Sequence, residues 1–220
     1  MNQAEELDLV HTFLPGRSAR TLLLLHGTGG NENDLIPLGR ELDPDANLLS
    51  PRGKVLENGM PRFFRRLAEG IFDEEDLIRR THELADFIQQ ASAKYRLNRQ
   101  NLLAVGYSNG ANIAGSLLLL RPQTLAGAIL LRPMVPPIVP EPLPDLSGVP
   151  VLAVSGRHDP IVPTDEALQL VHLLREAGAE VSGSLENAGH GLTELTLEIV
   201  RRWLENLTPR RQYLNRSSQR

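Results

Sequence analysis

The 220-residue chain contains no cysteine. This absence excludes a disulfide framework, Cys-ligated zinc or iron–sulfur clusters, and a catalytic thiol. Long apolar segments are also missing, because the longest leucine runs, 22–25 and 117–120, fall far short of the ~20 residues that span a bilayer. The first ten residues carry acids where a secretory signal would carry basic residues, so we expect a cytoplasmic protein that does not insert into membranes.

An excess of positive charge is absent as well. Lys and Arg number 23 against 27 Asp and Glu, and this net charge of −4 does not favour a nucleic-acid partner. Lysine itself is scarce, because only Lys54 and Lys94 occur and the other basic residues are arginines. The length and the ordinary composition fit a single domain, which we assign to residues 1–207, followed by a polar C-terminal tail at 208–220.

Short apolar runs alternate with stretches of helical periodicity along the chain. Strands are predicted within 21–27, 101–110, 126–133 and 149–160, and less strongly within 46–53. Helices are predicted after the serine of 106–110, over 75–95, from an N-cap at Thr164 to Gly178, and over 192–207. This alternation predicts an α/β fold with a doubly wound, mostly parallel sheet and helices on both of its faces.

Two segments interrupt the alternation, and both follow predicted strands. Residues 52–73 hold three of the five phenylalanines, and residues 133–144 are rich in proline. Ligands of open α/β sheets bind outside the carboxyl ends of the strands, so both segments are candidate walls of an apolar binding pocket. We expect the pocket to be lined by Phe63, Phe64, Phe72, Met134 and Val135.

The sequence Gly106-Tyr107-Ser108-Asn109-Gly110 has the spacing of a nucleophile elbow. In such an elbow a sharp strand-to-helix turn exposes the serine hydroxyl, and the two glycines leave room for the turn. An apolar strand precedes the motif and a helix-compatible segment follows it. Ser108 is therefore the candidate nucleophile, and the backbone N–H of Asn109 can donate a hydrogen bond to a developing oxyanion.

A serine hydroxyl needs a base, and among the six histidines His190 is the best candidate. It lies in a glycine-flanked loop between a strand-like stretch and the last predicted helix. The base needs an acid, for which Asp159 at the end of the strand in 149–160 is favoured. Asp165, where a helix should begin, is the alternative, and Asp145 falls at the wrong end of the strand.

A second glycine-rich turn, His26-Gly27-Thr28-Gly29-Gly30, follows the strand in 21–27. The backbone N–H of Thr28 is the expected second donor to the oxyanion. A dinucleotide-binding fingerprint would need glycine at position 32, where the chain has Glu32, and a Walker loop fails at Val55. We therefore expect no cofactor and no metal.

The four segments LLLLHGTGG, GYSNG, GRHDPIVP and AGHG occur in this order in one chain. Together they resemble the α/β hydrolases, and closely the small bacterial carboxylesterase/phospholipase family with its acyl-protein thioesterase-like members. Residues 57–77 resemble a subgroup of that family of which some members are associated with quinone or hydroquinone stress. One departure is that many members carry glutamine after the serine, where this chain has Asn109; its backbone would make the contact, so little loss is expected.

The resemblance implies Ser108, Asp159 and His190 as a catalytic triad in the chain order of the α/β-hydrolase fold, with oxyanion donors from Thr28 and Asn109. It also implies a compact enzyme without a large lid, often a homodimer. The expected activity is that of a serine carboxylesterase acting on small to medium esters. A thioesterase or lysophospholipase would share the triad, and a non-catalytic binding protein of this fold would usually lack part of it. Dienelactone hydrolases resemble the chain in size and fold but typically use cysteine.

Overall fold

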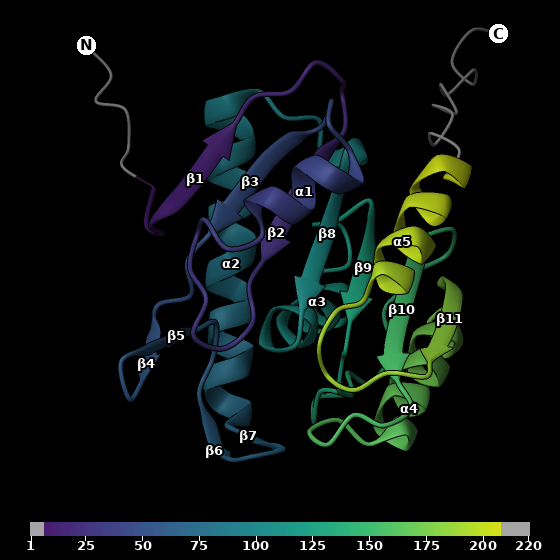
Figure 1. Ribbon diagram of the computed structural model, residues 1–220. Coiled ribbons are helices and arrows are strands. Elements are labelled where there is room, and N and C mark those ends of the chain that lie inside the picture. Colours follow the sequence, from purple (N-terminus) through teal and green to yellow (C-terminus); the bar gives the residue numbers. More distant parts are fainter. Residues whose placement is uncertain (1–6, 208–220) are drawn as a thin grey trace, which may run out of the picture.

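The computed structural model describes residues 7–207 (Figure 1). Its main sheet has seven strands: β1 (His11–Leu14), β2 (Thr21–Leu25), β3 (Asn47–Pro51), β8 (Leu102–Tyr107), β9 (Gly127–Leu131), β10 (Pro150–Gly156) and β11 (Glu180–Glu186). Two small hairpins are formed by β4 (Val55–Glu57) with β5 (Met60–Arg62) and by β6 (Arg66–Ala68) with β7 (Ile71–Phe72). The α-helices are α1 (Ile36–Leu42), α2 (Glu74–Tyr95), α3 (Asn109–Leu120), α4 (Thr164–Glu176) and α5 (Glu194–Asn206).

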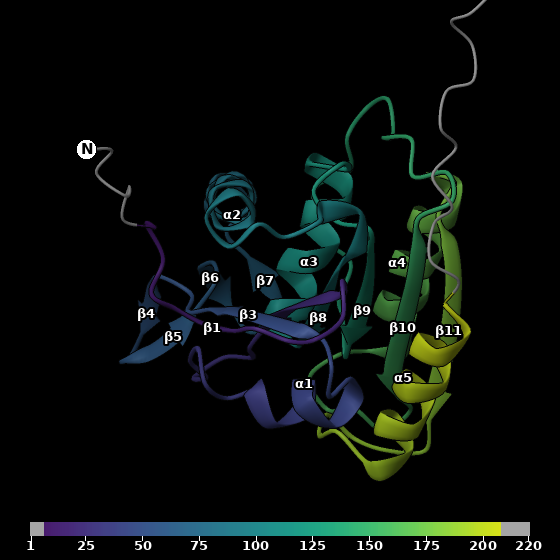
Figure 2. The same cartoon turned by 90° about the horizontal axis from the view of Figure 1, so that it is seen from above.

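The strands follow the order β1-β3-β2-β8-β9-β10-β11 across the sheet. All neighbours are parallel except β1, which pairs antiparallel with β3 at one edge. Helices α2, α3 and α4 cover one face of the sheet, and α1 and α5 cover the other (Figure 2). The predicted doubly wound, mostly parallel architecture is therefore confirmed.

The hydrophobic core is divided by the sheet into two parts, as strand β2 illustrates. Leu23 and Leu25 pack with the residues of α2 and α3, whereas Leu22 and Leu24 pack on the side of α1 and α5. Successive side chains of a strand point to opposite faces, so a strand covered on both sides must be apolar throughout. This requirement explains the unbroken leucine run, of which no side chain is exposed.

The register of the parallel strands brings their carboxyl ends to one edge. Leu25 pairs with Gly106, Tyr107 with Leu131, and Leu131 with Val154. The loops after β2, β8, β9 and β10 therefore all leave the sheet at the same level. We call the side formed by the carboxyl ends of the parallel strands the carboxyl edge, and the side formed by their amino ends the amino edge.

Several features of the fold were not predicted from the sequence. Strand β1 and helix α1 are too short to show a clear period, and the segment 52–73 contains the two hairpins. The predicted N-cap at Thr164 is wrong: Thr164 is already helical, and Pro163 occupies the cap without a side-chain hydrogen bond. The predicted tail at 208–220 lies outside the described residues.

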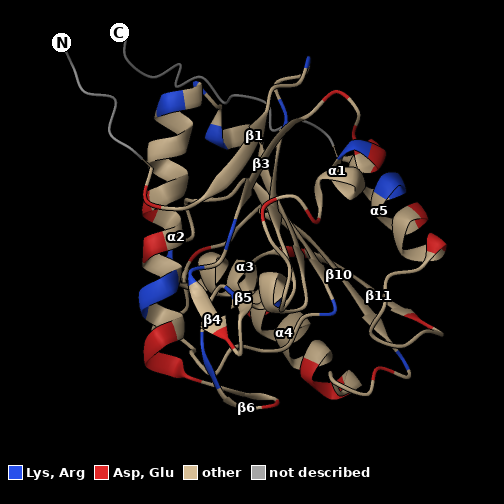
Figure 3. Ribbon diagram, turned by 60° about the vertical axis from the view of Figure 1, so that its left-hand side comes forward, with Lys and Arg blue, Asp and Glu red and all other residues tan. Residues whose placement is uncertain are grey.

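The longest helix, α2, carries charges of both signs along its length (Figure 3). Arg80 and Glu83, for example, form an ion pair of 2.7 Å between Nη1 and Oε2. Among residues 7–207, no helix combines the length and the hydropathy that a membrane span requires. The same residues contain no separate helical lid. The two hairpins and the proline-rich segment are the long connections that leave the sheet at the carboxyl edge.

Candidate active site

The turn from β8 into α3 holds Ser108 in a strained backbone conformation, with φ of 51° and ψ of −115°. Two glycines make the turn sterically possible. A Cβ atom at Gly106 would lie 2.4 Å from the Gly110 carbonyl oxygen, and one at Gly110 would lie 1.9 Å from that of Leu25. The spacing of glycines seen in the sequence thus has a direct steric cause. Positive φ at a non-glycine residue is costly and persists only where the surroundings enforce it.

Three of the predicted site residues form one continuous hydrogen-bonded chain. The Nε2 atom of His190 lies 2.9 Å from the Ser108 Oγ, and its Nδ1 atom lies 2.7 Å from the Asp159 Oδ2. Since a carboxylate can only accept, Nδ1 carries the proton and Nε2 is left free to accept from the serine hydroxyl. The structure therefore brings Ser108, His190 and Asp159 together from three separate loops at the carboxyl edge.

The carboxylate of Asp159 is fixed on its other side by the backbone. Its Oδ1 accepts hydrogen bonds from the N–H groups of Ile161 at 2.8 Å and Val162 at 3.0 Å. The side chain is 1% exposed, and that of His190 is 16% exposed. An acid held in this way orients the imidazole and gives it a fixed tautomer.

The other residues considered as the acid or the base of the triad make different contacts. Asp165 is in the first turn of α4, and Asp145 accepts a hydrogen bond from the backbone N–H of Ser147. His158, the neighbour of Asp159, instead contacts the Asn187 side chain at 2.7 Å through Nε2.

The turn after β2 approaches the elbow from the neighbouring strand. The Thr28 hydroxyl accepts a hydrogen bond of 2.6 Å from Arg62, and the Gly29 N–H donates to the Pro61 carbonyl at 2.9 Å. Within residues 7–207, none of the backbone–backbone hydrogen bonds of the turns and loops uses the N–H of Thr28 or Asn109. Arg62 is buried, and burial lowers the pKa of its guanidinium. Sequence reasoning missed Arg62, which connects the first hairpin to the Thr28 turn.

His26 anchors the base of the same turn. Its Nε2 accepts from the Gly53 N–H at 3.0 Å, so the proton is on Nδ1, which donates to the Gly27 carbonyl at 2.7 Å. Burial lowers the pKa of His26, and a second proton would set two N–H groups against each other at Gly53. His26 therefore stays neutral and holds the turn in place.

The two candidate pocket walls are both tied to helix α3 by asparagine side chains. The Oδ1 of Asn109 accepts from the Phe63 N–H at 2.8 Å, and that of Asn112 accepts from the Met134 N–H at 2.8 Å. Sequence reasoning considered only the backbone of Asn109 and gave no role to Asn112. The first turn of the helix that follows the nucleophile thus fixes the segments on both sides of it.

The five predicted pocket residues differ in their exposure. Phe63, Phe64 and Met134 are buried, and Phe64 has no accessible surface at all. Phe72 and Val135 are half-buried, and Phe72 packs edge-on against Phe64 with a centroid distance of 5.0 Å. In this conformation, Phe72 and Val135 keep part of their side-chain surface accessible, while the other three side chains are buried.

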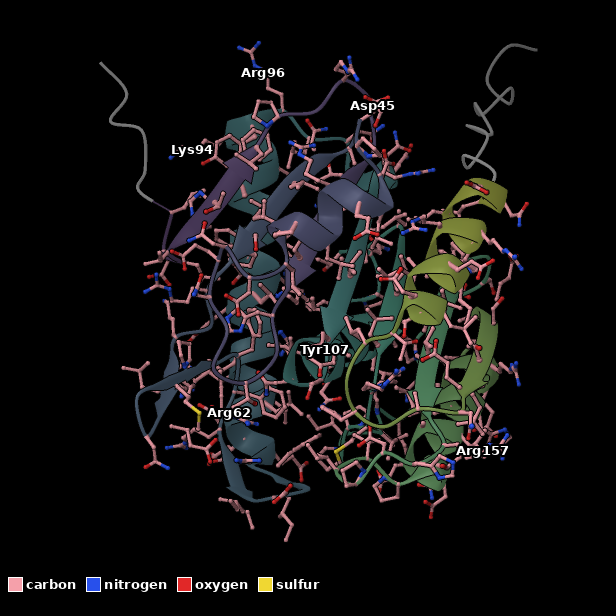
Figure 4. The ribbon with its side chains drawn as sticks, viewed as in Figure 1. Asp45, Arg62, Lys94, Arg96, Tyr107 and Arg157 are labelled. Carbon is pink, nitrogen blue, oxygen red and sulfur yellow. The ribbon has the colours of Figure 1, made fainter. Side chains whose placement is uncertain are left out.

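A large cavity lies at the amino edge instead. Its volume is about 1040 Å³, and Arg20, Asp43 and Trp203 are among the residues that line it. Figure 4 shows Asp45, which also lines it, at the opposite end of the sheet from Tyr107 of the elbow. None of the predicted site residues borders this cavity, and it has no comparable set of hydrogen-bonded catalytic groups. Geometry therefore places the candidate site at the carboxyl edge.

Comparison with known proteins agrees with the motifs and the fold. Residues 15–208 match the Phospholipase/Carboxylesterase family. A Bacillus subtilis (strain 168) protein named “Putative hydrolase MhqD” is 53% identical over 193 residues, which cover 88% of this chain and 96% of the relative.

Two solved structures show the same architecture. The Bacillus cereus carboxylesterase is 50% identical, with a TM-score of 0.87 over 90% of this chain and 94% of its own. YahD, solved with malic acid, is 29% identical, with a TM-score of 0.84 over 90% of this chain and 98% of its own. The chain thus has the α/β-hydrolase fold and belongs to the phospholipase/carboxylesterase family of hydrolases.

Proposed function

We propose that the protein is a serine carboxylesterase that hydrolyses small to medium carboxylic esters through an acyl-enzyme on Ser108. The observation that carries this proposal is the hydrogen-bonded chain from Asp159 through His190 to the strained Ser108. A base within hydrogen-bond distance activates a hydroxyl nucleophile, and a strained turn at the serine is typical of a nucleophile elbow.

In the proposed first half of the reaction, His190 Nε2 takes the hydroxyl proton as Ser108 Oγ attacks the ester carbonyl carbon. The carbonyl oxygen gains negative charge, which the N–H groups of Thr28 and Asn109 stabilise. Asp159 stabilises the imidazolium that forms. The imidazolium then gives its proton to the leaving alcohol as the carbon–oxygen bond breaks.

In the second half, a water molecule replaces the alcohol. His190 takes a proton from this water, which attacks the acyl-enzyme, and the proton returns to Ser108 Oγ as the carboxylic acid leaves. The whole cycle uses side chains and backbone groups of the chain alone. Malic acid, seen with the relative YahD, is a carboxylic acid, the class of product that this cycle releases.

The substrate class follows from the exposed residues of the walls. Phe72 and Val135 offer an apolar surface, which favours an alkyl or aryl group over a charged one. One continuous sheet contains strands from His11 to Glu186, and this supports our assignment of one catalytic domain. The cytoplasmic location and the homodimer remain predictions.

The test is a panel of p-nitrophenyl esters, aryl esters, acyl thioesters and lysophospholipids of graded chain length. We expect turnover of the shorter esters, and a drop of about 10⁴-fold or more in kcat for Ser108→Ala. A fluorophosphonate probe should label the wild type and not this variant. Ser116→Ala is the matched control, because Ser116 lies on the same helix and its hydroxyl donates to the Asn112 carbonyl.

Two results would contradict the proposal. Labelling or full turnover retained in Ser108→Ala would place the nucleophile elsewhere. A higher kcat/KM for thioesters or lysophospholipids than for esters would leave the assignment of the triad intact but would show that the proposed substrate class is wrong.

A further inference from the structure

The loop that carries His190 is held by side chains that take no part in the proposed proton transfers. Three consecutive backbone carbonyls in this loop each accept a hydrogen bond. Arg132 donates to Gly189 through Nε at 3.1 Å and to Gly191 through Nη2 at 2.8 Å. The Tyr107 hydroxyl donates to the carbonyl of His190 itself at 3.2 Å. The backbone on both sides of the imidazole is therefore fixed.

Arg132 is among the least exposed charged residues of the protein. Its exposed fraction is 0%, and its Nη2 lies 2.7 Å from Glu186 Oε2, which also accepts from the Thr196 hydroxyl at 2.8 Å. Its Nη1 donates to the Val154 carbonyl at 3.3 Å. Burying a guanidinium is costly unless its donors are satisfied, and here the loop carbonyls take two of them.

The ion pair is poorly suited to a role in stability alone. The pair joins Arg132 Nη2 to Glu186 Oε2 at 2.7 Å, which is not the two-pronged contact that arginine can give to a carboxylate. The guanidinium instead donates hydrogen bonds to two backbone carbonyls of the His190 loop. A buried ion pair is by itself weak evidence for stabilisation.

The backbone at Arg132 is strained as well. Arg132 directly follows β9, and its φ of 57° is in the left-handed region, while its N–H donates to the Val154 carbonyl at 2.8 Å. Backbone strain of this kind collects where a fold must place a group accurately. Ser108 has the same feature at the end of the neighbouring strand, β8.

We propose that Arg132, assisted by Tyr107, is a positioning residue that holds the 189–191 loop so that His190 bridges Asp159 and Ser108. This inference rests on the proposed function. A displacement of about 1 Å at a reacting group can cost on the order of 10²-fold in rate, so a loop with three restrained carbonyls has a direct catalytic use. Arg132 acts through the loop carbonyls, and Tyr107 acts through the His190 carbonyl and a tilted contact of 5.5 Å between its ring and the imidazole.

The test compares Arg132→Lys and Tyr107→Phe with the wild type. Arg132→Lys keeps the charge opposite Glu186, but its single nitrogen cannot span both loop carbonyls. We expect kcat to fall about 10- to 100-fold with KM changed less than about twofold, and a smaller fall for Tyr107→Phe. Fluorophosphonate labelling should slow in parallel.

A spectroscopic readout separates positioning from a merely structural role. We expect the proton between His190 Nδ1 and Asp159 Oδ2, which are 2.7 Å apart, to give a strongly deshielded NMR signal that broadens or moves in Arg132→Lys. Arg20→Lys is the matched control, because Arg20 also pairs with an acid at 2.7 Å, Asp43, but at the amino edge. This control should keep both kcat and the signal.

The proposal is overturned if Arg132→Lys lowers the thermal midpoint while kcat and the NMR signal stay as in the wild type. If Arg132→Lys does not fold, Tyr107→Phe decides: an unchanged kcat and signal overturn the proposal, and a loss of both supports it. The NMR readout needs no substrate. A wild type that hydrolyses no ester but shows the Arg132-dependent signal would therefore refute the proposed function and keep the positioning role.

Discussion

Individual arginines at the two edges of the sheet differ in how they are used. At the carboxyl edge, Arg132 and Arg62 are buried and donate to backbone and side-chain oxygens around the candidate site. At the amino edge, Arg17 pairs with Asp45 at 2.7 Å, but the two side chains are 87% and 52% exposed. A solvated pair of this kind contributes little to stability, whereas a buried guanidinium must be fully bonded to be tolerated.

This difference indicates that the fold positions side chains most precisely at the carboxyl edge. Ser108 and Arg132 directly follow neighbouring strands at the carboxyl edge, and both have positive φ. The amino edge has a cavity of about 1040 Å³, and its Arg17–Asp45 pair is exposed, whereas Arg20 and Asp43 there are 28% and 14% exposed. Tight packing, strain and buried polar contacts, rather than cavity volume, therefore mark the candidate site.

The largest effect should come from adding one methyl group at the elbow. In Gly110→Ala the new Cβ would lie 1.9 Å from the Leu25 carbonyl oxygen, so either the strand or the helix must move. We expect destabilisation of about 3 kcal/mol or more and loss of ester turnover. Chemical denaturation and the ester assay measure the two effects.

Gly115→Ala is the matched control on the same helix. Its new Cβ would meet only Leu170, at an ordinary 3.9 Å, and alanine favours a helix over glycine by about 1 kcal/mol. Stability should stay the same or rise. Equal losses in both variants would contradict the steric explanation of the elbow.

An intermediate effect is expected for His26→Gln, in the way that the free energy of unfolding depends on pH. Burial lowers its pKa, so below the ordinary value of about 6.5 the unfolded chain binds a proton that the folded chain does not. The free energy of unfolding therefore falls as the pH falls through this range. In His26→Gln this contribution is absent, so the stability gap to the wild type should narrow between about pH 7.5 and pH 5.5.

Urea denaturation across that range measures the gap. His172→Gln is the control, because His172 lies on α4 with 76% of its side chain exposed, where its Nε2 is 3.4 Å from Glu176 Oε1. The gap between this variant and the wild type should change less with pH than the gap for His26→Gln. A parallel curve for His26→Gln would show that the histidine at the base of the Thr28 turn does not titrate differently on folding.

The smallest effect is expected at the amino edge. Arg17→Gln removes an ion pair between two exposed side chains, and we expect a change in stability below about 0.5 kcal/mol and no change in turnover. Thermal unfolding and the ester assay provide the check. A loss above about 1 kcal/mol would remove the contrast between the edges.

The sequence predicted the strands and helices that have a clear period or an unbroken apolar run. Strand β2 and helix α2 are examples, because burial on two faces or on one stripe leaves a pattern in the residues. Strand β1, helix α1 and the hairpins left no such pattern. Thr164 was misplaced because a proline before a helix can occupy the cap position in place of a side-chain acceptor.

The candidate site shows the same division. Ser108 could be selected from the sequence because the spacing of its glycines is local. Asp159 and His190 could be selected because their order after Ser108 can be read directly along the chain. Arg132 could not, although an arginine directly after a buried strand is an unusual residue in that place. Its partners Gly189, Gly191 and Glu186 lie more than fifty residues away along the chain.

By itself the sequence determined the class of fold, the elbow and the identity of the groups able to carry out the chemistry, since these depend on short-range sterics and on residue type. The tertiary structure alone decided which carbonyls Arg132 holds, which of the five wall residues reach the surface, and that the two asparagines of α3 fix the walls. Such contacts join residues that the chain brings together only when the sheet is assembled, because parallel strands place distant loops along one edge.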